Sequence, residues 1–165
     1  MPSKFWVSHS KLSLYDGCPK AYYFAYVFRN PKSGKKVRHI TPSLALGQTA
    51  HTVLEELSRE PKNIRFREPL IAKFENNWQK ITGIKGGFDD AEQEHTYKKR
   101  GEEMMGRVYA NRRVLEGLAV KIKAENNLPR FDLVPEDGII LCGKIDWLSF
   151  DETLKSVHII DFKTG

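Results

Sequence analysis

The spacing of apolar residues changes near residue 117, and this change constrains the fold more than any other feature of the sequence. Before residue 117 apolar residues recur at helical spacing; after it they alternate, as in strands. The sequence therefore predicts an α/β fold, mainly helical over residues 1–117, with an antiparallel strand meander over 118–165. With 165 residues and 40% hydrophobic content, the chain can bury one core, so we expect a single domain.

Four helical segments are expected in the first part. Ser10 and Ser43 are the expected N-caps, because a serine hydroxyl can accept a hydrogen bond from a free amide of the first turn. Gly17 marks a break in the first segment, and Pro19 suits the first turn of a second short helix. The segments are residues 10–28, 43–60, 68–81 and 89–117. In the second segment an apolar stripe predicts the buried side: Leu46, Ala50, Val53, Leu54 and Leu57.

Three alternating segments, residues 118–125, 139–150 and 156–163, are the expected strands. Pro135 to Gly138 form a strong turn signal between the first two. If the second and third strands fold back about Thr153 and Leu154, position 146 pairs with position 161.

This register gathers three charged side chains. Asp161 and Lys163 lie on the same face of the last strand, about 6–7 Å apart, because side chains alternate along a strand. Asp146 on the preceding strand would oppose Asp161 at about 4.5–5.5 Å. Two close carboxylates repel unless a cation lies between them or one is protonated, and Mg²⁺ or Mn²⁺ prefers such oxygens. Lys163 could then orient or deprotonate a water, or stabilise charge on a phosphate.

Two interpretations of this cluster remain open. Asp161 and Lys163 can equally form an ion pair that closes a strand edge, with Asp146 an ordinary polar residue. His51 is a further candidate, since it interrupts an apolar helix; the alternative is a hydrogen-bonded histidine at the core boundary. Gly47, one turn earlier, costs roughly 1 kcal/mol relative to alanine in a helix, which predicts a close packing contact there.

The composition places limits on the class of protein. The chain has no apolar run of membrane-spanning length and no signal-peptide pattern, so we expect a cytoplasmic, intracellular protein without a membrane partner. Its net charge of +6 favours an acidic partner such as nucleic acid. Basic residues cluster at 29–39 and 98–113, where solvated surfaces are the alternative to nucleic-acid contacts. The aromatic block at 21–28 is expected to serve mainly in core packing, with base stacking as a second role.

Four blocks in order resemble the RecB-like branch of the PD-(D/E)XK nuclease superfamily, which includes CRISPR-associated exonucleases. They are "LSLYDGCPKAYYFAYV", "LALGQTAHTVLEEL", "GKIDWLSFD" and "VHIIDFKTG", and they span residues 12–165. The resemblance implies a restriction-endonuclease-like core and metal-dependent hydrolysis of DNA. It also implies that His51, Asp146 and Asp161 are metal ligands, that Asp146, Asp161 and Lys163 form the catalytic set, and that Lys163 positions the water.

The sequence departs from this family in two respects. A helix and a strand usually follow the D-x-K strand, so we expect the domain to be incomplete at its C-terminus. Some members bind an iron–sulfur cluster through four cysteines; Cys18 matches the first, but Cys142 is expected to be a small core residue. This chain alone is therefore not expected to assemble the cluster. Glu125 matches an acid found in some members, but its register with Asp146 is not defined, and it is left out of the site.

The sequence leads to one main hypothesis and two alternatives. The main one is a Mg²⁺- or Mn²⁺-dependent deoxyribonuclease, an exonuclease acting on single-stranded DNA or duplex ends in repair, recombination or phage DNA processing, with a helicase or recombination protein as a possible partner. The first alternative is a catalytically inactive DNA-binding or complex-forming module that retains the motif. The second is a nuclease that acts on RNA.

Overall fold

The structure, a computed structural model, describes residues 4–36, 40–120 and 130–164, without the side chain of Arg130. It has a mixed α/β fold, as predicted, with helices and two small sheets. The chain divides into two compact units, each built from two segments. Unit 1 comprises residues 1–39 and 122–144, and unit 2 comprises residues 40–121 and 145–165.

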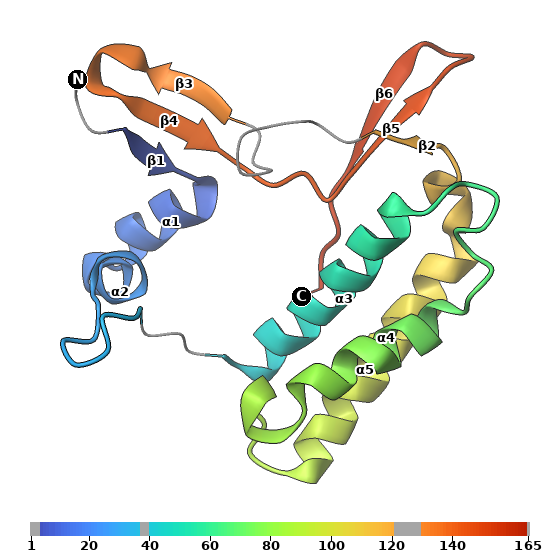
Figure 1. Cartoon of the computed structure of the whole chain (residues 1–165), viewed down its shortest axis with the longest axis horizontal. Helices are drawn as coiled ribbons and strands as arrows, with labels where there is room; N and C mark the ends of the chain where they lie inside the picture. The colour runs from blue at the N-terminus through green and yellow to red at the C-terminus, as the bar shows by residue number, and fades with distance from the viewer. Residues whose placement is uncertain (1–3, 37–39, 121–129, 165) are drawn as a thin grey trace. The chain divides into compact units, whose positions relative to one another are not determined.

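Three helices form the body of unit 2: α3 (Pro42–Arg59), α4 (Leu70–Trp78) and α5 (Ala91–Ala110). Each of them packs against the other two (Figure 1). The predicted stripe of α3 is confirmed, because all five of its residues are buried in the core of this unit. Phe74 and Trp78 of α4 and Met104 and Met105 of α5 are buried in the same core.

The ends of these helices differ from the prediction. Thr41, not Ser43, caps α3, since its hydroxyl accepts from the amide of Leu44 at 3.3 Å. The last residues of the third predicted segment form a 3₁₀ turn, Gln79–Ile81. The fourth helix ends at Ala110 rather than residue 117, because a further 3₁₀ turn, Arg112–Leu115, leads the chain into the sheet.

The sheet of unit 2 is antiparallel, with the order β2 (Leu118–Ala119), β5 (Trp147–Asp151) and β6 (Ser156–Ile160). Trp147 is fully buried against the helices, and Ile160 and Phe162 pack partly against the same core. Val157 and Ile159 are exposed, because alternation turns them to the other face of β6. The predicted hairpin about Thr153 and Leu154 is confirmed.

Unit 1 contains strands that the sequence did not predict. β4 (Ile139–Cys142) is the central strand of its sheet, with β1 (Phe5–Val7) parallel on one side and β3 (Arg130–Val134) antiparallel on the other. The predicted strand 139–150 is wrong as one element, since β4 and β5 belong to different sheets. The turn at Pro135 to Gly138 joins β3 to β4 instead of the predicted pair.

The helices of unit 1 follow the predicted break. α1 (His9–Gly17) precedes α2 (Pro19–Tyr22), which continues into a π-helical turn, Tyr23–Val27. Ser8, not Ser10, caps α1, because its hydroxyl accepts from the amide of Lys11 at 3.4 Å. The thiol of Cys18 caps α2 by accepting from the amide of Ala21 at 3.4 Å.

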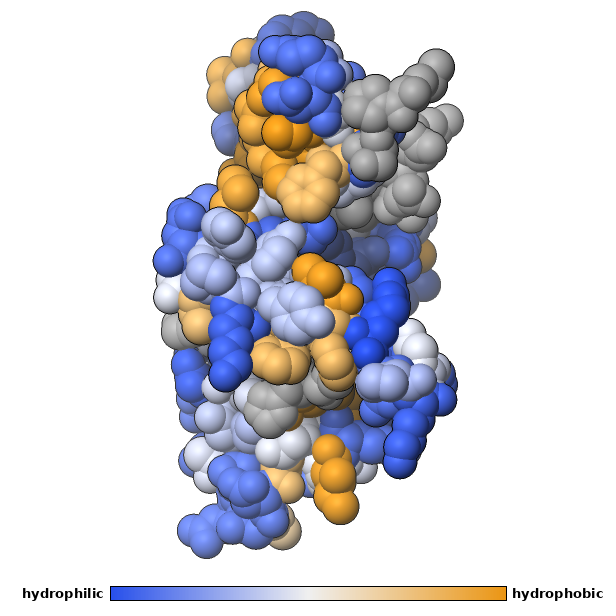
Figure 2. Space-filling view, turned by 90° about the vertical axis from the view of Figure 1, so that its left-hand side faces the viewer, coloured by the Kyte–Doolittle hydropathy of each residue, from blue (hydrophilic) through white to orange (hydrophobic). Residues whose placement is uncertain are grey.

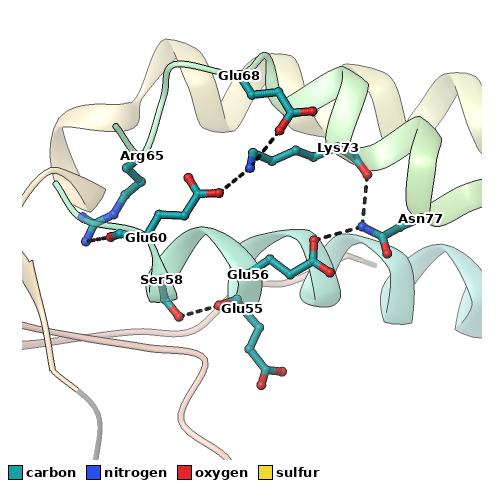
Figure 3. A network of polar contacts seen from close by, with 8 residues as sticks. All are labelled: Glu55, Glu56, Ser58, Glu60, Arg65, Glu68, Lys73 and Asn77. Carbon is teal, nitrogen blue, oxygen red and sulfur yellow. Dashed lines mark hydrogen bonds and ion pairs between the residues drawn. The ribbon is translucent and has the colours of Figure 1, made fainter. Parts of the chain in front are cut away.

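A polar network connects the C-terminal end of α3 to α4 (Figure 3). The ammonium of Lys73 on α4 contacts Glu60 at 2.5 Å and Glu68 at 3.2 Å. The amide of Asn77, one turn further, donates to Glu56 of α3 at 3.1 Å. These contacts join the two helices in addition to their shared apolar core.

Arg65 is buried between this network and β5. Its guanidinium donates to the carbonyl oxygens of Leu115, of Gly117 at 3.0 Å and of Glu60 at 3.3 Å, and lies 5.0 Å from the centre of the Trp147 ring. Burial lowers the pKa of Arg65, and the charge of Glu60 opposes that shift. Arg65 therefore ties the loop after α3 to the segment that enters β2.

Across the three described ranges, none of the helices has both the length and the apolar character that a bilayer span requires.

Candidate active site at the end of the β5–β6 ladder

Asp146 and Asp161 lie at opposing positions where the β5–β6 ladder ends. The last pair of the ladder is Trp147 with Ile160, so residues 146 and 161 are the next positions of the same register. The register from which this pairing was predicted is therefore confirmed, with positions 146 and 161 one step beyond the last ladder pair. The ladder ends here because the amide of Phe162 donates to a side-chain oxygen of Asp146, at 3.0 Å, and not to a strand carbonyl.

Both oxygens of the Asp146 carboxylate have partners within the protein. Oδ2 accepts the bond from Phe162, and Oδ1 lies 3.2 Å from Nδ1 of His51 on α3. The Asp146 side chain is only 11% exposed, whereas that of His51 is 34% exposed. Helix α3 therefore supplies His51, and the residue before β5 is Asp146, so two of the predicted site residues are in direct contact.

Asp161 and Lys163 form an ion pair on the exposed side of the terminal segment. Their side chains are 58% and 83% exposed. The hydrogen bond from Lys163 is the main cause that lowers the pKa of Asp161, with smaller contributions from a hydrogen bond to Asp146 and from the charge of His51. The same hydrogen bond raises the pKa of Lys163, so its amine stays protonated.

The terminal segment runs along α3 and α5. A Cβ atom added to Gly47 would lie 3.1 Å from Oγ1 of Thr164, which confirms the predicted close contact at this glycine. Arg100 of α5 donates to the carbonyl oxygen of Thr164 at 3.4 Å. His51 follows Gly47 by one turn, so the close approach at Gly47 brings the D-x-K segment alongside the histidine.

A cavity of about 280 Å³ lies beneath this segment in unit 2. Asp161 and Lys163 line it, together with Arg107 of α5 and apolar side chains that include Leu54 and Met104. Arg107 is exposed and forms no ion pair among the described residues. In the sequence Arg107 stands out only as part of a basic cluster, although its spacing of seven from Arg100 places both on one side of α5.

The two carboxylates at the site suit a hard divalent cation, and the imidazole is a nitrogen donor that suits transition metals. His51 contacts Asp146, and Asp161 lies opposite Asp146 in the strand register. The three side chains do not converge on one position that a metal could occupy. Within the described residues, no group of three or more His, Cys, Asp or Glu side chains is arranged as a metal site. The assignment of His51, Asp146 and Asp161 as ligands stays a prediction.

The other candidates from the sequence lie elsewhere or outside the described residues. Glu125 is in the range 121–129, which the structure does not describe. Cys142 is partly buried in β4, and its thiol donates to the carbonyl of Val7 at 3.2 Å. The expected core role of the aromatic block 21–28 is wrong, because none of its side chains is buried.

Comparison with known proteins assigns the family. Residues 6–165 match the PD-(D/E)XK nuclease superfamily, nearly the whole chain. No curated protein and no solved structure shows a significant match. The matched range includes His51, Asp146, Asp161 and Lys163, and the family is one of nucleases, enzymes that hydrolyse nucleic acids, generally with divalent metals. The chain belongs to the PD-(D/E)XK nuclease superfamily.

Proposed function

We propose that this protein is a Mg²⁺- or Mn²⁺-dependent deoxyribonuclease of the RecB-like branch that degrades DNA from ends. The observation that carries the proposal is the opposition of Asp146 and Asp161 at the ladder end, with His51 in contact with Asp146. Nuclease chemistry requires charge stabilisation around a phosphodiester, and these residues concentrate two acids, an imidazole and an ammonium in one place.

His51, Asp146 and Asp161 would hold the metal, which when bound supplies Lewis-acid chemistry at the phosphate. Because the pKa of Lys163 is raised, its ammonium suits hydrogen bonding to the attacking water or to a phosphate oxygen, and not proton abstraction. Asp161 orients that ammonium through their ion pair. The contact with His51 fixes the direction of the Asp146 carboxylate.

The biological setting belongs to the same proposal. Degradation from single-stranded or duplex ends suits repair, recombination or phage DNA processing, where a helicase or recombination protein would present the end.

The test is cleavage of labelled linear DNA with Mg²⁺ or Mn²⁺, with closed circular DNA and RNA as parallel substrates. Asp161→Ala and Lys163→Ala should abolish cleavage while the circular dichroism spectrum stays unchanged, because both side chains are largely exposed. Glu152→Ala, which removes an exposed acid in the β5–β6 turn, is the matched control and should cleave normally. Wild-type activity in Asp161→Ala would overturn the assignment.

One observation favours a second candidate, an inactive DNA-binding module. Both Asp146 oxygens are already engaged by Phe162 and His51, which leaves this carboxylate less available to a metal. If the wild type binds DNA but neither binds Mn²⁺ nor cleaves any of the three substrates, this second function replaces the first.

A further inference from the structure

A group of three tyrosines lies on the helical part of unit 1. Tyr15 of α1 and Tyr22 of α2 contact edge to face at 5.4 Å between ring centres, and Tyr26 of the π-helical turn lies 5.3 Å from Tyr22. The ammonium groups of Lys11 and Lys36 lie 5.3 and 5.8 Å from the centre of the Tyr26 ring. We refer to these five residues as the tyrosine patch.

The rings of this patch do not serve as a core. Tyr15 is 54% exposed, and Tyr22 and Tyr26 are partly exposed. The buried hydrophobic residues of unit 1, among those described, are Val7 and Ile140 of its sheet. Hydrophobic residues lie at the surface between hydrophilic ones on the side shown in Figure 2. Exposed aromatic rings beside lysines need another explanation than packing.

The net positive charge of the chain comes from the segment that carries this patch. Residues 4–36 carry seven Lys and Arg and one acid, Asp16, which gives +6, equal to the net charge of the whole chain. The charges of the remaining residues therefore cancel, with 20 Lys and Arg and 20 Asp and Glu. Lys11 donates one hydrogen bond, to the carbonyl of Trp6 at 2.9 Å, and neither Lys11 nor Lys36 pairs with a carboxylate among the described residues. This part of the surface suits a polyanion.

The local backbone adds an independent feature. Residues 23–27 form a π-helical turn, a rare conformation that occurs often at functional sites. It continues directly from α2 and places Tyr26 next to Tyr22 while Tyr23 and Phe24 form a separate ring contact at 5.5 Å.

We infer that the tyrosine patch binds a single-stranded segment of nucleic acid, with bases stacked on the tyrosine rings and phosphates at Lys11 and Lys36. Stacking needs an open base face, which single strands present and duplexes do not. The inference rests on the proposed function in that the bound strand is the substrate, and it adds a strand preference and a binding surface outside the candidate active site.

The test is fluorescence anisotropy with a labelled oligothymidylate of about 15 nucleotides. EDTA is present throughout, so that binding is measured without cleavage. Tyr15→Ala should weaken binding roughly 5- to 150-fold, the range for losing one stacked base, and Tyr15→Phe should bind as the wild type because it keeps the ring. Lys36→Ala should reduce the slope of log K against log salt by about 0.7, as for one lost phosphate contact on a single strand.

Matched controls come from unit 2. Tyr109→Ala removes a tyrosine that is 44% exposed, and Lys85→Ala removes an exposed lysine; both should bind the oligonucleotide as the wild type. Equal binding by wild type, Tyr15→Ala and Lys36→Ala would overturn the inference, as would equal affinity for a duplex of the same length. Binding to phosphatidylserine vesicles in place of the oligonucleotide, lost in Phe24→Ala, would assign the surface to membranes and also overturn it.

The outcomes separate this inference from the proposed function. Patch-dependent binding without metal-dependent cleavage would support the binding surface and reject the nuclease. Cleavage that is lost in Asp161→Ala, combined with single-strand binding unaffected by Tyr15→Ala, would support the nuclease and reject the patch.

Discussion

His51 Nδ1 lies 3.2 Å from Oδ1 of Asp146. Helix α3 thus contacts the residue directly before β5, where the β5–β6 ladder ends. The contact joins two residues 95 positions apart in the sequence. Under the proposed function, His51 is either a metal ligand itself or the group that orients the Asp146 carboxylate.

His51→Ala should weaken Mn²⁺ binding by roughly 10- to 100-fold, the range for losing a group that orients or accompanies a metal ligand. Isothermal titration calorimetry with Mn²⁺ measures this directly, and DNA cleavage should fall in parallel. His95→Ala, which removes an exposed histidine of α5, should change neither quantity. Unaltered Mn²⁺ affinity in His51→Ala would remove the histidine from the site.

Arg107→Ala should raise KM for DNA several-fold and leave kcat nearly unchanged. Arg107 lines the cavity shared with Asp161 and Lys163, so we expect its guanidinium to contact a phosphate of bound DNA and not the reacting atoms. The salt dependence of 1/KM should lose a slope of about 0.7 to 0.9, for one phosphate contact. Lys99→Ala, an exposed cation of the same helix, is the control and should retain the wild-type slope.

Gly101→Ala should destabilise the protein by about 1–3 kcal/mol, because overpacking forces neighbouring side chains out of place. The added Cβ would lie 2.1 Å from Cζ of the buried Phe74 ring. Gly106→Ala on the same helix has nothing within 4 Å and should stabilise by about 0.5–1 kcal/mol. Urea denaturation of both variants checks the contrast, and equal effects would mean that α4 and α5 pack less closely at Gly101.

Lys73→Met should lower the free energy of unfolding by about 1–3 kcal/mol at neutral pH, since Lys73 is 11% exposed and bonded to charged partners. Burial is the largest single effect on its pKa and lowers it, but the bonds to Glu60 and Glu68 together raise the pKa above 10.5. The stabilisation is therefore complete below pH 10.5 and is lost as the pH rises through the folded-state pKa.

The difference in the free energy of unfolding between wild type and Lys73→Met, measured by urea titration, should then become smaller above pH 10.5. Lys85→Met, at an exposed position, should show a small difference at every pH. If the loss of unfolding free energy in Lys73→Met did not change with pH, packing of the aliphatic stem, and not the ion pairs, would stabilise this site.

Local periodicity was sufficient to predict the elements whose partners are close in sequence. The stripe of α3 and the β5–β6 register depend on repeats within about 20 residues, and both are confirmed. The alternation of residues 139–150 continues through Gly143 and Asp146, so nothing in it showed that the chain passes from one sheet to another.

Non-local pairing explains most of what the sequence did not predict. β1 has only three residues and pairs in parallel with β4, more than 130 positions later, so no local pattern marks it as a strand. The sequence singled out His51 because it interrupts an apolar helix, and only the family resemblance grouped it with Asp146. The aromatic block was assigned to a core on its density alone, although the unit that carries it buries few side chains.

The interleaving of the two units has a consequence for any dissection of this protein. Each unit is made of two stretches separated by residues of the other, so no single truncation isolates either one. A fragment ending at residue 121 keeps all three large helices and His51 but loses β5, β6 and all three candidate catalytic residues, Asp146, Asp161 and Lys163. A version of unit 2 in one piece would have to be engineered by joining residues 121 and 145 with a new linker.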